Sequence, residues 1–202
     1  MGQLDQPLIL YLHGFTSGPQ SHKAQTLGAR MAARGLGQRF VCPQLPASPA
    51  AAITLAEALS ASKVGADSTA TQPLTVVGSS LGGYYATWLA ERHDCRAVLI
   101  NPAVASAVSL EKYIGPQRWL YSGETFEFTR QHIAELAALE LPALSKPQRF
   151  WLLVEEGDET LDYRHAVTRY AGARQTVLSG GDHSFTRWTD YLDEIIDFAG
   201  FK

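Results

Sequence analysis

The sequence predicts an α/β fold built on a mostly parallel sheet with helices on both faces. Two observations lead to this prediction. Short apolar, β-rich runs alternate with helix-like stretches from one end of the chain to the other. The apolar runs are also continuous, with no polar residue at every second position, which is typical of strands covered on both faces. Parallel neighbours need crossover connections, which are expected to be right-handed.

Six apolar runs rich in β-branched and aromatic residues predict the strands. In chain order they occupy residues 7–13, 39–45, 73–78, 96–101, 149–155 and 174–179. The stretches with helical character occupy residues 21–34, 53–62, 82–92, 129–139, 163–171 and 188–198. The predicted sheet therefore has six strands, and a helix follows each of them.

Two segments fall outside this alternation. Residues 62–72 are small and polar and lead into a strand, so they predict a surface loop and not a linker between domains. Residues 102–148 form the longest gap between strands and are rich in aromatic side chains. A gap of this length predicts a lid-like insertion or a substrate wall within a single domain that spans residues 1–202.

The composition is that of one globular domain and argues against several classes of partner. The 202 residues are enough for a hydrophobic core, and the net charge of −3 shows no basic excess for nucleic acid. The two cysteines, Cys42 and Cys95, are too few for a disulfide framework and lie in no zinc-binding pattern. The N-terminal apolar run spans about six residues, too short for a signal peptide or a membrane span. We expect a cytoplasmic protein with no membrane anchor.

Residues 78–82, Gly-Ser-Ser-Leu-Gly, match G-x-S-x-G between a predicted strand and a predicted helix. In this setting the motif forms a sharp turn that lifts the hydroxyl of its middle serine, Ser80, clear of the sheet. Side chains at Gly78 and Gly82 would collide with neighbouring backbone, and Ser79 is expected to pack behind the turn. The alternative is a Gly/Ser helix cap after a buried strand. The absence of P-loop and G-x-G-x-x-G patterns favours the interpretation of Ser80 as a nucleophile.

A serine nucleophile needs a histidine base and a carboxylate that orients it. His183 follows the last predicted strand on a Gly-rich loop, at the edge where sites form in open α/β sheets. Five carboxylates follow or end the strand at 149–155: Glu155, Glu156, Asp158, Glu159 and Asp162. Asp158 follows a turn glycine, whereas Asp162 precedes a helix and is expected to be its N-cap. The alternative for Asp158 is an ordinary turn aspartate. The chain order serine, acid, histidine favours Asp158 as the acid.

Backbone N–H groups are expected to form the oxyanion hole. The residue after the nucleophile, Leu81, supplies one, and Phe15 in the loop after the first strand supplies the other. Gly14 lets the backbone of this loop approach the nucleophile. His13 is expected to be a structural hydrogen-bonding residue and not the base.

Aromatic residues of the insertion predict the substrate pocket. We expect Tyr113, Trp119 and Phe126 to line an acyl pocket, because they follow a strand whose carboxyl end faces the site. The alternative is that Trp119 only packs the insertion onto the rest of the domain.

Along nearly its whole length the chain resembles the α/β-hydrolases and, among them, the small YqiA-type bacterial esterases. The matching segments are "YLHGF" with "SHKAQTL" after it, "GSSLGGYYAT", "LINPAV", "EEGDETLDYRHAV" and "RQTVLSGGDHSF". The resemblance implies carboxylesterase or acyl-thioester hydrolase activity without metal or organic cofactor, carried by Ser80, Asp158 and His183. The resemblance implies an uncharged amide at position 182, beside the histidine, and Asp182 departs from it.

Two functions other than an esterase stay open at this stage. An acyl-CoA thioesterase would need a basic patch for phosphates, to which Lys112, Arg118 and Arg130 could contribute. A non-catalytic binding protein could keep the same fold, since fold does not fix function. The leading hypothesis is a serine esterase that acts on a small-molecule ester of short to medium acyl chain through an acyl-enzyme.

Overall fold

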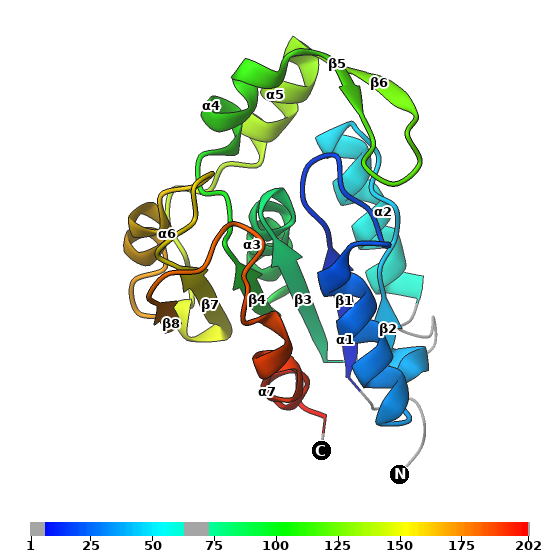
Figure 1. The fold of residues 1–202 in the computed structure, drawn as a ribbon, viewed down its shortest axis with the longest axis vertical. Coiled ribbons are helices and arrows are strands. Elements are labelled where there is room, and N and C mark those ends of the chain that lie inside the picture. The colour runs from blue at the N-terminus through cyan, green and yellow to red at the C-terminus, as the bar shows by residue number, and fades with distance from the viewer. Residues whose placement is uncertain (1–6, 63–72, 202) are drawn as a thin grey trace.

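The computed structural model describes residues 7–62 and 73–201 (Figure 1). Its main sheet has six strands, all paired in parallel, in the order β2-β1-β3-β4-β7-β8. The strands are β1 (Leu8–Leu12), β2 (Phe40–Val41), β3 (Leu74–Ser79), β4 (Arg96–Ile100), β7 (Phe150–Glu155) and β8 (Arg174–Leu178). The prediction of a parallel six-stranded α/β sheet is confirmed. Most of the predicted surface loop, residues 63–72, lies outside the described residues.

Helices cover both faces of the sheet, as Figure 1 shows. One face packs against α1 (His22–Ala33) and α7 (Leu192–Phe198). The other packs against α2 (Pro49–Ser62), α3 (Leu81–His93) and α6 (Tyr163–Arg169). Short 3₁₀ turns are η2 (Gly37–Arg39), η4 (Pro147–Arg149) and η5 (Trp188–Tyr191). In the described ranges, no helix is both long and apolar enough to cross a membrane.

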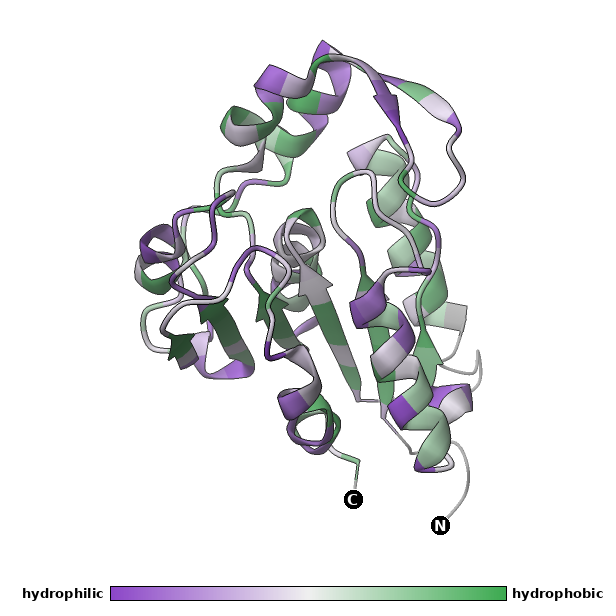
Figure 2. Ribbon diagram, in the orientation of Figure 1, coloured by the Kyte–Doolittle hydropathy of each residue, from purple (hydrophilic) through white to green (hydrophobic). Residues whose placement is uncertain are grey.

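Burial explains why the strand runs are continuous. Every residue of β1 and of β7 is buried, because helices cover both sides of each strand. Figure 2 shows the same pattern as hydrophobic strands at the centre and hydrophilic stripes on the outer helices. The edge strand β2 is shorter than the predicted run 39–45, because Pro43 and Pro46 have no N–H to donate.

The insertion, residues 102–148, crosses the carboxyl ends of the strands (Figure 1). It contains α4 (Ser106–Leu110), η3 (Glu111–Tyr113), an antiparallel hairpin of β5 (Gly115–Arg118) and β6 (Thr125–Phe128), and α5 (Arg130–Ala138). The hairpin was not predicted, because the β5 sequence Gly-Pro-Gln-Arg lacks the residues that favour strands. The Leu120 N–H donates to the Thr16 carbonyl at 2.9 Å. The hairpin is therefore tied to the loop that follows β1.

Candidate active site

The nucleophile turn is a single residue between β3 and α3. Ser80 has φ 55° and ψ −122°, a conformation that non-glycine residues rarely adopt. Three backbone hydrogen bonds hold it: its N–H donates to the Ile100 carbonyl (3.0 Å), and its carbonyl accepts from the N–H groups of Gly83 (2.9 Å) and Ala103 (3.1 Å). The strain is therefore fixed by the surrounding backbone, as in a nucleophile elbow.

Two glycines leave room for this turn. A Cβ at Gly78 would overlap the carbonyl of Gly82, and a Cβ at Gly82 would overlap the carbonyl of Leu12. Both clashes are with backbone, which cannot move aside without disturbing the sheet. The structure thus gives the motif glycines the role expected from the sequence.

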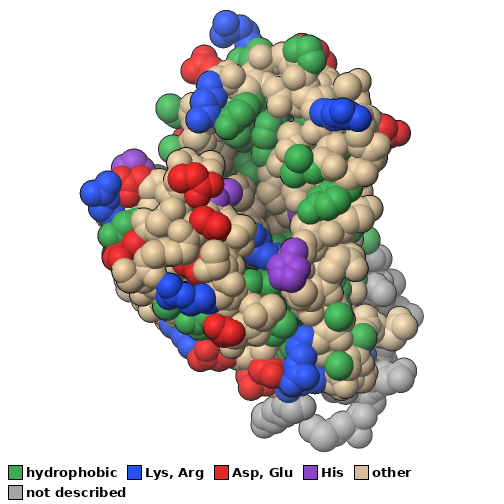
Figure 3. Space-filling model, viewed as in Figure 1, with side chains coloured by type: hydrophobic (Ala, Val, Ile, Leu, Met, Phe, Trp, Pro, Cys, Tyr) green, Lys and Arg blue, Asp and Glu red, His purple; other side chains and the backbone are tan. Residues whose placement is uncertain are grey.

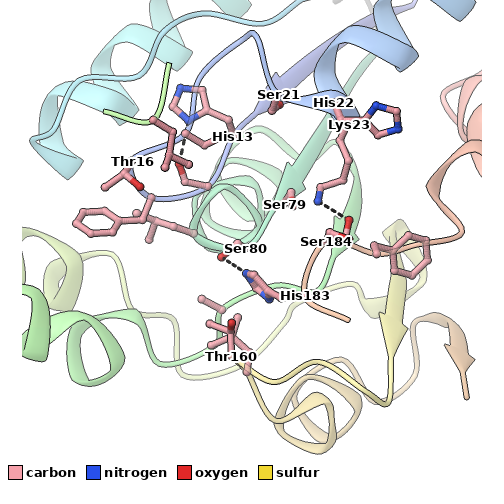
Figure 4. Close-up of a pocket in the computed structure, with 18 of the residues that line it drawn as sticks. His13, Thr16, Ser21, His22, Lys23, Ser79, Ser80, Thr160, His183 and Ser184 are labelled. Atoms are coloured by element: carbon pink, nitrogen blue, oxygen red, sulfur yellow. Dashed lines mark hydrogen bonds between the residues drawn. The ribbon is translucent and has the colours of Figure 1, made fainter. Parts of the chain in front are cut away.

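Ser80, His183 and Asp158 form a continuous chain of hydrogen bonds. His183 Nε2 lies 3.0 Å from Ser80 Oγ, a contact drawn in Figure 4. On the other side of the ring, Nδ1 lies 2.9 Å and 2.8 Å from the two carboxylate oxygens of Asp158. The Asp158 side chain is only 2% exposed and also accepts from the N–H groups of Thr160 and Leu161, each at 2.9 Å. This arrangement can hold the ring proton on Nδ1 and leave Nε2 able to accept the serine proton.

Asp162 has the other role that the sequence suggested for it. Its side chain caps α6 by accepting from the Arg164 N–H at 3.0 Å. The Arg164 guanidinium also pairs with this carboxylate and lowers the pKa of Asp162 to about 2. The structure therefore places Asp158 beside His183 and Asp162 at the cap of α6.

The oxyanion loop passes beside the nucleophile. A Cβ built on Gly14 would lie 3.2 Å from Ser80 Cβ, so only glycine allows this approach comfortably. Within the described residues, the N–H groups of Phe15 and Leu81 donate to no other protein group. Sequence reasoning missed one feature of the loop, the positive φ of Thr16 (57°), inside a turn closed by the Ser17 N–H on the Gly14 carbonyl. Two free donors near Ser80 Oγ are what an oxyanion hole requires.

His13 and Asp182 take structural positions. His13 is buried, its Nδ1 pairs with the Gly14 carbonyl (2.9 Å), and its Nε2 accepts from the Leu45 N–H (3.0 Å). It therefore joins the loop after β1 to the segment that follows β2, as a structural hydrogen-bonding residue. The Asp182 carboxylate accepts from the N–H of Ser184 at 2.7 Å and from the Ser184 hydroxyl, and these bonds lower the pKa of Asp182.

Neither cysteine is suited to act as a nucleophile. Cys42 and Cys95 are both free, and burial raises the pKa of each thiol to about 12. A thiol with such a pKa holds almost no thiolate at neutral pH. In the described part of the chain, no group of three or more His, Cys, Asp or Glu residues is arranged to hold a metal ion.

Sequence reasoning missed two residues that hold the His183 loop. Asn101, at the end of β4, is 2% exposed with φ 40°. Its Oδ1 accepts from the Glu155 N–H (3.0 Å), and its Nδ2 donates to the carbonyls of Asp182 (3.0 Å) and His183 (3.3 Å). The only available signal was a polar residue directly after an apolar strand.

Glu155, at the end of β7, anchors the same loop. Its carboxylate is fully buried and accepts from the N–H of Asp182 (2.9 Å), both N–H (2.8 Å) and Oγ1 (2.8 Å) of Thr186, and the Arg187 N–H (3.2 Å). Burial acts to raise the pKa of Glu155, but the bonds from Thr186, Asp182 and Arg187 outweigh it and the pKa is lowered. Glu155 is thus a positioning residue for His183.

Glu155→Gln is expected to reduce both stability and turnover. The neutral amide keeps one acceptor oxygen but turns its NH₂ toward backbone donors, so the loop loses hydrogen bonds to a charged acceptor (about 2 kcal/mol). Because the folded pKa is depressed, this stabilisation is present above the ordinary value of 4.5 and fades as the pH falls below it. Chemical denaturation of both proteins at pH 7 and below pH 4 measures the difference. A stability gap that grows on acidification would contradict this role.

A cavity of about 660 Å³ opens above the triad. Ser80 and His183 line it together with Leu110, Lys112, Tyr113, Leu120 and Tyr121 of the insertion. Figure 3 shows this face hollowed, with hydrophobic side chains on the wall formed by the insertion and histidine and Lys/Arg side chains lower down. Leu110 at the end of α4, and Leu120 and Tyr121 in the turn between β5 and β6, were missed because only the folded insertion shows which of its side chains face the cavity.

Only one of the three predicted pocket aromatics lines this cavity. Tyr113 does, but Trp119 and Phe126 line a separate space of about 20 Å³ with Phe15. The rings of Trp119 and Phe126 pack at 4.5 Å, and Phe126 meets Phe15 edge-on at 6.1 Å. The acyl-pocket prediction for Trp119 and Phe126 is therefore corrected: they pack the hairpin against the oxyanion loop.

Solved structures of similar shape have α/β folds. They include "Putative hydrolase from Agrobacterium vitis S4" (TM-score 0.71, 20% identity, 98% of this chain and 89% of that chain). The esterase domain of a Rhodothermus marinus protein matches with TM-score 0.66 and 18% identity over 96% of this chain and 87% of that chain. A monoacylglycerol lipase from Paleococcus ferrophilus matches with TM-score 0.66 and 13% identity over 97% and 96%. At these identities the likeness concerns the fold.

The family assignment comes from the sequence itself. Residues 8–200, nearly the whole chain, match the family described as "Uncharacterised protein family (UPF0227)". The chain therefore belongs to UPF0227, the YqiA-type family that its motifs resemble, and it has the α/β-hydrolase fold.

Proposed function

We propose that this protein is a serine esterase that hydrolyses carboxylic esters of short to medium acyl chains. The observation that supports this most strongly is the Ser80–His183–Asp158 chain of hydrogen bonds beside two unused backbone donors. Each part has one role in acyl transfer, and together they fill all the roles that ester hydrolysis needs. The esterases and lipases among proteins of similar fold agree with this reaction class.

In the proposed reaction, Ser80 Oγ attacks the ester carbonyl while its proton passes to His183 Nε2. The carbonyl oxygen becomes an oxyanion and accepts from the N–H groups of Phe15 and Leu81. The imidazolium then gives its proton to the leaving alkoxide, which departs as the alcohol and leaves an acyl ester on Ser80. Water loses a proton to His183 and attacks this ester, and the acid is released as Ser80 recovers its proton. Every proton moves among Ser80, His183, the leaving alcohol and water, so the scheme calls for no cofactor.

A thioesterase acting on acyl-CoA is the second candidate, favoured by one observation. Lys112 lines the cavity at an exposed position, where it could meet a phosphate. The other two basic residues considered from the sequence give less support. Arg118 Nε donates to the Gly123 carbonyl within the hairpin (2.8 Å), and neither Arg118 nor Arg130 lines the cavity. The ester reading is therefore preferred.

A fluorophosphonate ester distinguishes an enzyme from a binding protein on a hydrolase fold. The reagent phosphonylates a serine only where a base activates it and an oxyanion hole stabilises the adduct. We expect one adduct on the intact protein and, after digestion, its location on Ser80. Absence of an adduct under conditions that label a known serine esterase would refute the catalytic proposal.

Acyl-chain preference should depend on Tyr113 and not on Trp119. Contact of one or two acyl methylenes with Tyr113 is worth about 1 kcal/mol, so Tyr113→Ala should lower kcat/KM for hexanoyl esters roughly fivefold more than for acetyl esters. Trp119→Ala is the matched control: it should lower both values equally and reduce Tm, since Trp119 packs on Phe126 outside the main cavity. A selective loss of hexanoyl ester hydrolysis in Trp119→Ala would show that Trp119 lines the acyl pocket.

A further inference from the structure

A lysine from the first turn of α1 reaches into the catalytic cavity. Lys23 is half-buried and lines the cavity next to Ser21 and His22. Figure 4 shows its side chain extending from α1 toward Ser184, whose carbonyl accepts from Nζ at 2.7 Å. Within the described part of the chain Lys23 forms no ion pair. An ammonium group has three donors, so two remain for a ligand.

The carboxylates around Lys23 are committed to other partners. Asp182 binds Ser184, Asp158 binds His183, and Glu155 binds the backbone of the His183 loop. Burial lowers the pKa of Lys23 to about 8, although these three carboxylates act in the opposite direction. In the described part of the chain no carboxylate pairs directly with Lys23, so a half-buried ammonium group in a ligand cavity is left at a position that an anionic ligand would stabilise.

A second unused donor lines the same cavity. Tyr11, on β1, is fully buried, and its hydroxyl makes no hydrogen bond of good geometry within the described residues. The groups that influence its ionisation include Ser79 and Tyr121, which both line the cavity, so the hydroxyl end faces that space. Burial raises the pKa of Tyr11 well above 10, which keeps the phenol protonated and able to donate.

We propose that Lys23 and Tyr11 form a subsite for a carboxylate on the alcohol portion of the ester, so that the substrate is an acylated hydroxy acid. This inference rests on the proposed esterase function and specifies its substrate class. Lys23 binds the carbonyl of Ser184, the neighbour of His183, and His183 must protonate the leaving oxygen. The subsite therefore lies on the leaving-group side.

The residues that line the cavity also indicate the charge of the ligand and the position of the acyl chain. One ammonium group flanked by Asp182, Asp158 and Glu155 suits a monoanion, because these carboxylates would repel a second negative charge. The acyl chain is left with the apolar side of the cavity, formed in part by Leu110, Tyr113, Leu120 and Leu161.

Two esters that differ only in charge test this subsite. They are the hexanoyl esters of 4-hydroxybutanoate and of 4-hydroxybutanamide, whose hydrolysis is followed by chromatography of the released hexanoate. Lys23→Met should lower kcat/KM for the carboxylate ester about 10- to 100-fold more than for the amide ester, the effect of losing a charge-assisted hydrogen bond. Lys112→Met is the matched control, since Lys112 lines the cavity with its ammonium 5.2 Å from the centre of the Tyr113 ring. It should change both rates by a similar factor.

Each outcome has a separate meaning. An equal loss of kcat/KM for both esters in Lys23→Met would show that Lys23 serves only to connect α1 to the His183 loop, and would overturn the proposed subsite. An equally selective loss in Lys112→Met would overturn it in favour of a general positive field. If the wild-type protein hydrolysed neither ester nor simple aryl esters, the proposed esterase function itself would fail.

The pH dependence gives a second readout. The titratable groups around Lys23 are His22 on its own helix, Tyr11 on β1, Glu155 at the end of β7 with Asp158 and Glu159 after it, and Asp182 and His183 after β8. Taking the ratio of the two kcat/KM values cancels the ionisation of His183, which both esters need. The preference for the carboxylate ester should hold below pH 8 and fade above it as Lys23 loses its proton. In Lys23→Arg the preference should persist at pH 9, because arginine stays protonated. A preference that is pH-independent in both proteins would contradict the assignment.

Discussion

Ser80→Ala is expected to abolish ester hydrolysis while the protein stays folded. The change removes the hydroxyl that lies 3.0 Å from His183 Nε2 and leaves the oxyanion loop and the cavity intact. Loss of a triad serine lowers kcat by about 10⁶-fold. Stability should change little, because alanine meets the same backbone strain at φ 55° as serine does. Initial rates with an aryl acetate and the thermal melting curve measure the two effects.

The neighbouring serine provides the control. Ser79 is buried behind the turn, and no hydrogen bond links it to His183, so Ser79→Ala should keep turnover of the same aryl acetate. His183→Ala should lose roughly 10³-fold or more in kcat, because among the described residues His183 is the base that contacts Ser80 Oγ. An inactive Ser79→Ala beside an active Ser80→Ala would show that the turn presents the other serine.

Local pattern was sufficient to predict the sheet and the proximity of Ser80, Asp158 and His183. Strands buried on both faces leave continuous apolar runs, and α/β sheets place their functional residues after the strands. Ser80, Asp158 and His183 each follow a strand of this kind, so their meeting could be anticipated from the order of elements alone. The structure adds the distances that join them.

The hairpin shows where local pattern fails. Trp119 and Leu120 are adjacent, yet Leu120 lines the main cavity and Trp119 packs against Phe126 beside a separate small space. Both residues lie in the connection between β5 and β6, where Leu120 and the next residue, Tyr121, both line the cavity, so the alternation of a strand does not assign these side chains. Aromatic composition cannot resolve such a choice.

The roles of the residues that hold the His183 loop could not be predicted from the sequence for a different reason. Asn101 and Glu155 make their hydrogen bonds to residues that are distant in sequence, at the ends of different strands. A buried carboxylate at the end of an apolar strand is visible in the sequence, but its partners are not. Only the packed sheet brings β4, β7 and the loop after β8 together.

Asp158→Asn is expected to lower kcat by up to roughly 10⁴-fold with little loss of structure. An amide at this position donates through its NH₂ to His183 Nδ1, which moves the ring proton to Nε2. The histidine then donates toward Ser80 Oγ and can no longer accept its proton. The amide oxygen still accepts from the N–H groups of Thr160 and Leu161, so the turn is retained.

Asp162→Asn is the matched control, since it makes the same chemical change four positions away. It should keep kcat and lower Tm, because it weakens the α6 cap and removes the ion pair with Arg164. The pKa of Asp162 is lowered to about 2, so this stabilisation is present above the ordinary value of 3.8 and is lost as the pH falls toward 2. The Tm difference between wild type and Asp162→Asn should therefore shrink between pH 4 and pH 2, as seen by calorimetry at several pH values. If Asp162→Asn were the inactive variant and Asp158→Asn kept its turnover, the acid of the triad would have to be reassigned to Asp162.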